Sequence, residues 1–158
     1  MKLGATEPPR GVQMDEPRNP RLDLHGPPRI LVIEDEPLIA LLIEEMVREI
    51  GYRISNVSHT IAMARKEISK RNFDAVLLDI NISGRNHPEL ADLMLETGAP
   101  FAFVTGYDYL VEPRHEHLPI LQKPFTPLQL RTLLEELTGS RSLTGEIAQT
   151  AAVQARAL

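Results

Sequence analysis

The chain has 158 residues, 42% of them hydrophobic and 25% charged, which fits one globular domain with a hydrophobic core and flanking segments. The absence of cysteine excludes disulfide bonds and thiolate metal sites and is typical of a reducing cytoplasm, where we expect the protein to be located. A net charge of -5 disfavours nucleic-acid binding, no apolar stretch approaches the ~20 residues that span a bilayer, and the amino terminus lacks the apolar core of a signal peptide.

Residues 1–28 differ in composition from the rest of the chain. They contain six of the 13 prolines and show no hydrophobic periodicity, which predicts a disordered, proline-rich lead. The folded domain is therefore expected to begin at Arg29 and to extend through residue 138. Residues 139–158 carry five alanines and a faint helical stripe, and we expect a mobile tail there, with docking onto the domain as the alternative.

Short apolar runs alternate with helical patterns along the folded part. The runs predict five strands: Arg29–Ile33, Ile54–Val57, Ala75–Leu78, Phe101–Val104 and Ile120–Leu121. Helical periodicity predicts helices over residues 37–50, 61–71, 88–97 and 127–137. Residues 107–118 resist assignment, because Pro113 and several charges interrupt any period. The alternation predicts an α/β domain with a parallel sheet that helices cover on both faces.

Polar residues follow the predicted strands. Glu34 and Asp35 come after the first, Asp79 after the third, Thr105 after the fourth and Lys123 after the fifth. Because the strands are parallel, these residues meet at one edge, where ligands bind in open α/β sheets. Three carboxylates there repel one another unless a cation lies among them, and Mg²⁺ suits such hard oxygen ligands. A lysine and a hydroxyl suit a phosphoryl group. The alternative to a phosphoryl-binding site is an ion pair between Lys123 and one of the acids that has only a structural role.

At these positions the sequence resembles the receiver domain of bacterial two-component response regulators. Four motifs in the expected order carry the resemblance, which covers about residues 29–137: Ile30-Leu-Val-Ile-Glu34-Asp35-Glu36, Leu77-Leu78-Asp79, Thr105-Gly106 and Lys123-Pro124-Phe125. The resemblance implies a flavodoxin-like five-stranded parallel sheet in the order 2-1-3-4-5, with helices on both faces. It also places Pro124 at the family's usual cis-proline position.

The resemblance further implies roles for individual residues. Asp79 would accept a phosphoryl group from a histidine kinase or phosphotransfer protein, Thr105 would hydrogen-bond that group and Lys123 would pair with it. Four residues would organise Mg²⁺, namely Glu34 (through water), Asp35, Asp79 and Asn81 (through its main-chain carbonyl). The output would be a protein–protein interaction, or the protein would act as a phosphate sink, since no DNA-reading domain fits after the last core helix.

A narrower resemblance concerns residues 100–107. Their sequence Pro-Phe-Ala-Phe-Val-Thr-Gly-Tyr is similar to the Pro-Phe-x-Phe-Ala-Thr-Gly-Tyr motif of a subgroup of stand-alone receivers, with Val104 the one departure. Receivers usually carry an aromatic switch residue where this chain has Ile120, which is a poor rotamer switch because it is β-branched. We therefore expect residues 106–118 to respond to phosphorylation, with Tyr107 as the side chain most affected.

Two other functions remain as alternatives. A pseudo-receiver would bind a partner without phosphorylation, and Ile120 keeps that possibility open. An aspartate-nucleophile phosphohydrolase of the haloacid-dehalogenase type needs a second acid two residues after the nucleophile, where this chain has Asn81. We thus expect a signalling phosphoacceptor that catalyses only its own phosphorylation and dephosphorylation. His115 and His117 are expected to be solvated rather than to bind a metal.

Overall fold

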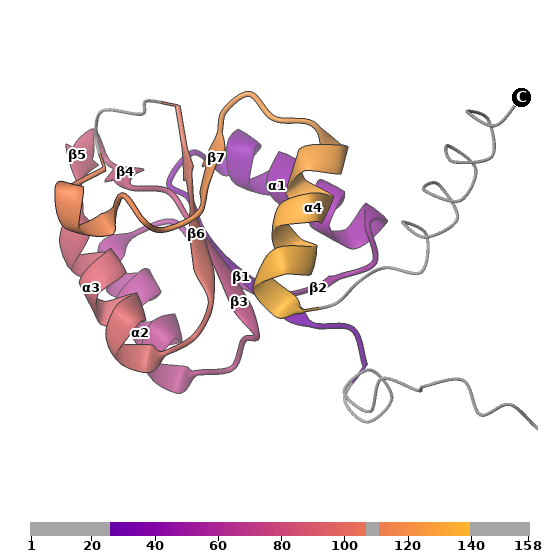
Figure 1. The fold of residues 1–158 in the computed structure, drawn as a ribbon, viewed down its shortest axis with the longest axis horizontal. Helices are drawn as coiled ribbons and strands as arrows, with labels where there is room; N and C mark the ends of the chain where they lie inside the picture. The colour runs from indigo at the N-terminus through magenta and orange to yellow at the C-terminus, as the bar shows by residue number, and fades with distance from the viewer. Residues whose placement is uncertain (1–25, 107–110, 140–158) are drawn as a thin grey trace, which may run out of the picture.

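Five parallel strands form the central sheet of the computed structural model, which describes residues 26–106 and 111–139 (Figure 1). Their order is β2-β1-β3-β6-β7, which is the predicted order 2-1-3-4-5 of a flavodoxin-like sheet. The bounds are β1 Arg29–Ile33, β2 Arg53–Ser58, β3 Ala75–Leu78, β6 Phe101–Thr105 and β7 Ile120–Gln122. Of the predicted lead only residues 26–28 are described, and there the main-chain carbonyl of Pro28 accepts the N–H of Arg53 at 3.0 Å. Of the predicted tail only Gly139 is described.

Helices cover the sheet on both faces, as the sequence predicted. Helices α1 (Pro37–Glu49) and α4 (Pro127–Thr138) pack on one face, and α2 (Ile61–Lys70) and α3 (Pro88–Thr97) pack on the other (Figure 1). Each face has its own hydrophobic core. The sheet therefore lies between two layers of helices.

Strand β3 shows why the central strands read as unbroken apolar runs. Side chains alternate across a strand, and in β3 both faces are buried. Val76 and Leu78 pack into the core beneath α2 and α3, whereas Ala75 and Leu77 pack into the core beneath α1 and α4. Asp79 follows directly, so the buried strand holds the Asp79 carboxylate at the sheet edge.

The helices begin where the sequence indicates. Pro37 and Pro88 occupy the first helical position of α1 and α3, where the missing N–H of proline has no helical partner to lose. The Thr60 hydroxyl accepts the main-chain N–H three residues further on in α2. Thr126 and Gln129 form a reciprocal capping box at the start of α4. These caps fix the helix ends next to the sheet edge.

A small antiparallel ribbon after β3 was not predicted. It consists of β4 (Asn81–Ile82) and β5 (Arg85–Asn86). Its two-residue turn places Ser83 at φ 56° and Gly84 at φ 74°, which is the left-handed backbone that matches strand twist in tight hairpins. Strands of two residues are too short to show an alternating pattern, so the sequence alone did not reveal the ribbon.

The connection between β6 and β7 contains a short 3-10 helix, η2 (Pro113–His115), and no α-helix among residues 111–119. The expectation of a solvated His115 is wrong: the side chain is 2% exposed and packs against Phe103 with ring centroids 6.2 Å apart. Burial is possible because His115 Nε2 lies 2.9 Å from Asp92 Oδ1 on α3. His117 is exposed, as expected.

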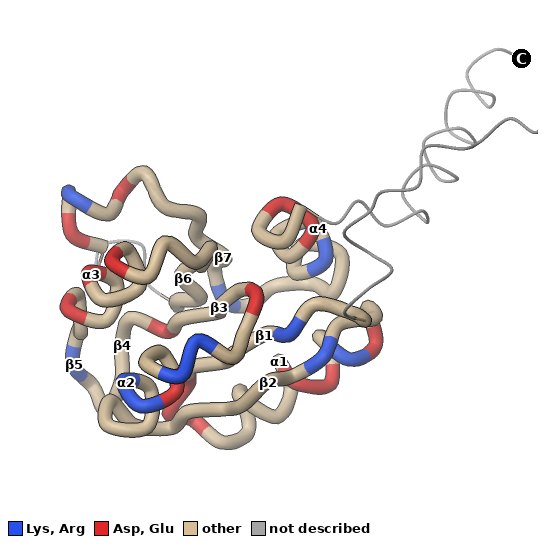
Figure 2. Tube along the Cα trace, turned by 90° about the horizontal axis from the view of Figure 1, so that it is seen from below, with Lys and Arg blue, Asp and Glu red and all other residues tan. Residues whose placement is uncertain are grey.

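Charged residues of both signs are distributed around the described part of the chain (Figure 2). On α2 the exposed side chains of Arg65, Lys66 and Lys70 lie alongside Glu67, which pairs with Lys70 at 2.7 Å. The outer surface of α2 is therefore a mixed-charge, solvated face. None of the described helices combines the length and apolar character that a membrane crossing requires.

Candidate functional site

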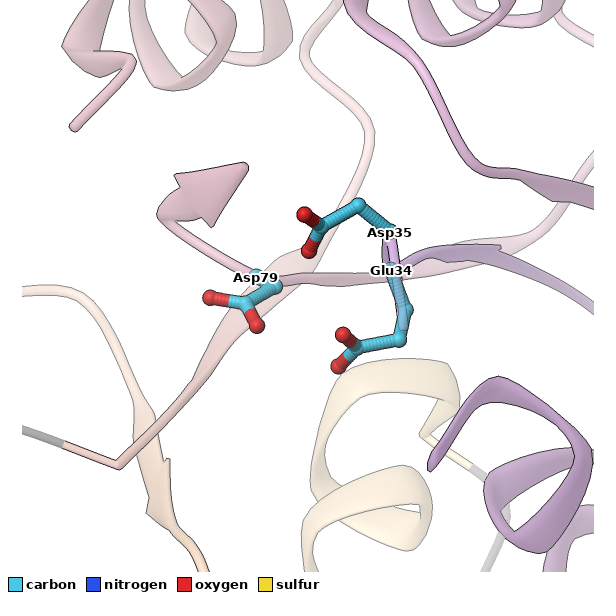
Figure 3. Close-up of side chains that lie close together, drawn as sticks. All are labelled: Glu34, Asp35 and Asp79. Atoms are coloured by element: carbon cyan, nitrogen blue, oxygen red, sulfur yellow. The ribbon is translucent and has the colours of Figure 1, made fainter. Parts of the chain in front are cut away.

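Three carboxylates converge at the carboxyl edge of the sheet (Figure 3). Glu34 and Asp35 lie on the loop after β1, and Asp79 lies directly after β3. One oxygen from each side chain falls within 4.8 Å of the other two. Glu34 is 1% exposed and Asp79 6% exposed, while Asp35 is partly exposed. The structure thus brings together the three acids that the sequence placed at this edge.

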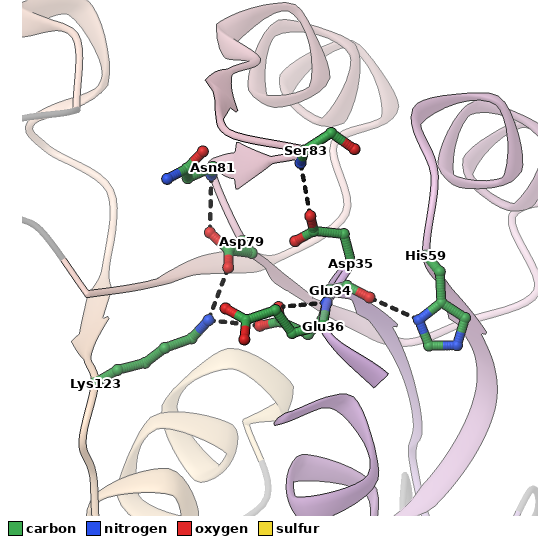
Figure 4. Close-up of polar contacts among 8 residues, drawn as sticks. All are labelled: Glu34, Asp35, Glu36, His59, Asp79, Asn81, Ser83 and Lys123. Carbon is green, nitrogen blue, oxygen red and sulfur yellow. Dashed lines mark hydrogen bonds and ion pairs between the residues drawn. The ribbon is translucent and has the colours of Figure 1, made fainter. Parts of the chain in front are cut away.

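Lys123 reaches into this cluster from the end of β7 (Figure 4). Its Nζ donates to Glu34 Oε2 at 2.5 Å and to Asp79 Oδ2 at 2.7 Å. The Lys123–Pro124 peptide bond is cis, as expected from its position. The main-chain N–H of Lys123 donates to the carbonyl of Thr105 at 2.8 Å, and the Thr105 side chain is buried. The side chains of Glu34, Asp35, Asp79 and Lys123 therefore gather at one site, and Thr105 is joined to Lys123 through the main chain.

The buried charges change the proton affinity of two of these groups. Burial raises the pKa of the Glu34 carboxyl; the hydrogen bond from Lys123 opposes this effect, and the nearby Asp79 carboxylate adds to it. Burial lowers the pKa of Lys123, but its hydrogen bonds to Asp79 and Glu34 outweigh burial and leave the pKa raised. Lys123 thus stays charged at neutral pH. One lysine faces three acids, so the site retains an affinity for further positive charge.

Main-chain N–H groups of the ribbon orient two of the acids (Figure 4). The N–H of Asn81 donates to Asp79 Oδ1 at 2.8 Å, and the N–H of Ser83 donates to Asp35 Oδ2 at 2.6 Å. The two oxygens of Asp79 consequently have different partners, Asn81 for one and Lys123 for the other. The ribbon fixes the direction of both carboxylates.

The pairing of the ribbon also sets the direction of the Asn81 carbonyl. The N–H of His87 donates to the carbonyl of Ile80 at 3.1 Å, which marks a hydrogen-bonded pair. Such pairs alternate along an antiparallel ladder, so the next pair, Asn81 with Asn86, is not hydrogen-bonded across the ribbon. The N–H and C=O of Asn81 therefore both point away from β5. Since the N–H meets Asp79, the carbonyl lies on the side of the acids.

These oxygen atoms fit a magnesium ion. Mg²⁺ prefers carboxylate, carbonyl and water oxygens, and the site offers three carboxylates and a main-chain carbonyl on the same side. No sulfur or imidazole ligand is present in this cluster. The donor set agrees with the magnesium site predicted from the sequence.

Ile120, which the sequence implicated in signal output, is not part of the acidic cluster. Ile120 is 41% exposed at the start of β7, where it lies opposite Phe103 in the β6–β7 register. Tyr107 lies outside the described residues. Ile120 takes no part in the hydrogen bonds of Asp79 and Lys123.

Sequence reasoning missed two residues that contact the acids. One is Ser83, whose contact is made by the main chain and leaves no side-chain signal. The other is His59, which follows β2, and its Nδ1 donates to the carbonyl of Glu34 at 2.8 Å (Figure 4). The rule that polar residues after parallel strands meet at one edge would have identified His59, had it been applied to the second strand as well.

Comparisons with known proteins agree with this fold and site. The model of the response regulator receiver domain matches residues 30–135. The phyllosphere-induced regulator PhyR of Methylorubrum extorquens is 30% identical over 112 residues, which is 68% of this chain and 42% of PhyR. The chain thus spans less than half of that relative.

Two solved structures show the same architecture. SdrG from Sphingomonas melonis Fr1 is 32% identical with a TM-score of 0.63, and the match covers 70% of this chain and 96% of SdrG. The receiver domain of the sensor histidine kinase PA1611 from Pseudomonas aeruginosa PAO1 shares the fold at 23% identity, with a TM-score of 0.63 and coverage of 73% and 100%. The chain belongs to the response regulator receiver domain family, and its relative PhyR is named as a regulator.

Proposed function

We propose that this receiver accepts a phosphoryl group on Asp79 from a histidine kinase or phosphotransfer protein, in a Mg²⁺-dependent reaction. One observation carries the proposal: the Asp79 carboxylate lies at the sheet edge with Lys123 Nζ 2.7 Å away and the Glu34 and Asp35 carboxylates within the same cluster. A structural ion pair alone would need only one acid and one lysine.

Asp79 would act as the nucleophile. A carboxylate oxygen of Asp79 attacks the phosphorus of a phosphohistidine, the P–N bond breaks, and the imidazole leaves with the bonding electron pair and takes up a proton. The N–H of Asn81 holds one Asp79 oxygen in place, and Lys123 neutralises charge near the other. Such chemistry depends mainly on positioning and electrostatic stabilisation, which these fixed contacts provide.

Mg²⁺ would be held by four residues: Glu34 through water, Asp35, Asp79 and Asn81 through its main-chain carbonyl. When bound, the ion would supply charge neutralisation for the phosphoryl oxygens in addition to that of Lys123. The PA1611 receiver, which shares the fold, is described with a magnesium ion coordinated in its active-site cleft. This neighbour supports the ion, and the carboxylate cluster of this chain supports the ligands.

Thr105 and Lys123 would contact the transferred group. A phosphoryl group offers strong acceptor oxygens, to which a hydroxyl and an ammonium donate. The Lys123 N–H to Thr105 carbonyl bond keeps the ends of β6 and β7 together, so both side chains would respond as a unit. SdrG, which is 34% identical in this comparison, has also been solved in a BeF3-activated conformation, which supports an activated state in a similar receiver. Output would proceed through a protein partner or through withdrawal of phosphoryl groups from another regulator.

Intact-mass measurement with a small phosphodonor tests the proposal. Wild-type protein incubated with acetyl phosphate and Mg²⁺ should gain the mass of one phosphoryl group, and EDTA should prevent that gain. A mass gain that is equal in EDTA would contradict the magnesium requirement. No gain under any condition, with acetyl phosphate or with a phosphohistidine donor, would favour the pseudo-receiver instead.

A further inference from the structure

His59 holds the main chain between two of the acids. Its Nδ1 lies 2.8 Å from the carbonyl oxygen of Glu34. A carbonyl can only accept, so Nδ1 carries the proton and donates. The contact links the end of β2 to the loop that carries both Glu34 and Asp35.

This contact continues the β1–β2 ladder after the strands have separated. The N–H of Glu34 donates to the carbonyl of Ser58 at 3.0 Å. In a parallel ladder, the carbonyl of the same residue then accepts the N–H two positions beyond that partner, which is Thr60. Thr60 is the N-cap of α2, where the chain turns out of the sheet. The ring of His59 donates to the Glu34 carbonyl at the position where a continued ladder would place the N–H of Thr60.

The hydrogen bond fixes more than one atom. The carbonyl of Glu34 and the N–H of Asp35 belong to one planar peptide unit, so holding the carbonyl also holds the direction in which the chain enters Asp35. At its other end the Asp35 carboxylate accepts the N–H of Ser83 at 2.6 Å. Mutual repulsion among three acids pushes Asp35 outward, and these two contacts oppose that movement.

We propose that His59 is a positioning residue: its Nδ1–H holds the Glu34–Asp35 peptide plane in the orientation that binds Mg²⁺ at the acidic site. This inference rests on the proposed function, because it assigns His59 a role in metal binding there. His59 itself contacts neither the metal nor the phosphoryl group in this scheme. Its effect passes through the main chain of Glu34.

Two substitutions separate the Nδ1 donor from the rest of the ring. In His59→Asn the amide nitrogen is as many bonds from the main chain as Nδ1 is, so the donor is retained. In His59→Ala it is lost. In His59→Gln the amide nitrogen is as many bonds from the main chain as Nε2 is. A polar side chain of similar size therefore remains, but it has no donor at the position of Nδ1. His117→Ala, which removes an exposed histidine, is the control.

Isothermal titration calorimetry with MgCl₂ measures the effect directly. His59→Ala and His59→Gln should weaken Mg²⁺ binding by about tenfold, as is typical when a partner that orients a metal ligand is lost. His59→Asn should stay within about twofold of wild type, and His117→Ala should match wild type. Thermal unfolding in EDTA, recorded on the same proteins, detects any loss of stability separately from the loss of affinity.

Each result supports or overturns the inference. Equal affinity in wild type, His59→Gln and His59→Ala would overturn it, even if the variants unfold at a lower temperature. Equal weakening in His59→Asn and His59→Ala would also overturn it, because the ring rather than the Nδ1 donor would then matter. If His59→Ala does not fold, the comparison of Mg²⁺ affinity between His59→Gln and His59→Asn decides whether the Nδ1 donor matters. A wild-type protein that binds no Mg²⁺ would refute the proposed function itself, which is a different outcome from normal binding that is insensitive to His59.

Discussion

Lys123 and Asp79 are 44 residues apart in the sequence, yet Lys123 Nζ lies 2.7 Å from Asp79 Oδ2. The same ammonium lies 2.5 Å from Glu34 Oε2, and both carboxylates are largely buried. Charges that are removed from water need a partner, and removing one member of such a group leaves the others uncompensated. Lys123 is therefore a structural element of the site as well as a proposed contact of the phosphoryl group.

Lys123→Gln should destabilise the metal-free protein. With Glu34 and Asp79 left unpaired, the free energy of unfolding should fall by roughly 2 to 3 kcal/mol, less than for a fully enclosed pair because Lys123 retains some exposure. Urea unfolding in EDTA measures this change. Mg²⁺ should bind the variant more tightly than wild type, since one competing positive charge is gone. An unchanged urea midpoint together with unchanged Mg²⁺ affinity would contradict this description of the site.

Asp35→Asn should have the opposite effect on the metal-free protein. It removes one of three like charges while the amide oxygen can still accept the N–H of Ser83, so the free energy of unfolding should rise by about 1 kcal/mol. The stabilisation that Mg²⁺ gives to wild type should be largely lost. Thermal unfolding with and without MgCl₂ tests both effects. Glu49→Gln makes the same change of charge at an exposed position of α1 and should alter neither.

The opposite edge of the sheet provides a pH-dependent prediction. The carboxylate of Asp74 accepts the main-chain N–H of Arg29 at 2.7 Å and its Nε at 3.2 Å. Burial raises the pKa of Asp74, but the hydrogen bonds from Arg29 outweigh burial and lower it. A lowered pKa in the folded state means that the stabilisation is present above about pH 3.9, the ordinary value for aspartic acid, and is lost as the pH falls through the folded-state pKa.

Wild type should consequently exceed Asp74→Asn in unfolding free energy at pH 7, and the difference should shrink below about pH 4. Denaturant unfolding at a series of pH values from neutral to acid gives this curve. A difference that is constant throughout the range would show that the charge on Asp74 contributes nothing and that the loss is one of packing alone.

The buried His115 leads to a paired prediction. Its ring is 2% exposed, contacts Phe103 and places Nε2 2.9 Å from Asp92 Oδ1. His115→Ala should lower the free energy of unfolding by about 2 to 3 kcal/mol, because it opens a cavity and leaves Asp92 without this partner. His117→Ala, two residues away and exposed, should change it by less than about 0.5 kcal/mol. Similar values for the two variants would mean that His115 does not hold the β6–β7 connection to α3.

Some sequence signals were sufficient to predict the strands, the helix starts and the acidic site. Strand β3 is buried on both faces and therefore appears in the sequence as an unbroken apolar run. The end of that run places Asp79 at the edge of the sheet. Glu34 likewise follows the largely buried strand β1, whereas Lys123 follows the short strand β7, in which only Leu121 is buried. These residues were placed at one edge because parallel strands end on the same side of the sheet. The predicted helix starts agree with the structure, in which Thr60 and Thr126 cap α2 and α4 through local contacts.

The parts that could not be predicted depend on contacts between distant segments. His115 is buried because Asp92 on α3 is in reach, and no local pattern reveals that partner. The N–H of Ser83 orients Asp35 through the main chain, which any residue type could do. The ribbon strands are two residues long, too short for a period to appear. Burial of polar groups and main-chain contacts are therefore the features that required the structure.

Phosphorylation of Asp79→Asn against wild type tests the central claim most directly. Asparagine keeps the volume of Asp79 and an oxygen for the N–H of Asn81, but it lacks the nucleophilic carboxylate. Both proteins are incubated with acetyl phosphate and Mg²⁺, and their intact masses are measured after confirming by circular dichroism that the variant is folded. The proposed function predicts one added phosphoryl group on wild type and none on Asp79→Asn. A phosphoryl group on Asp79→Asn at the wild-type level would contradict it.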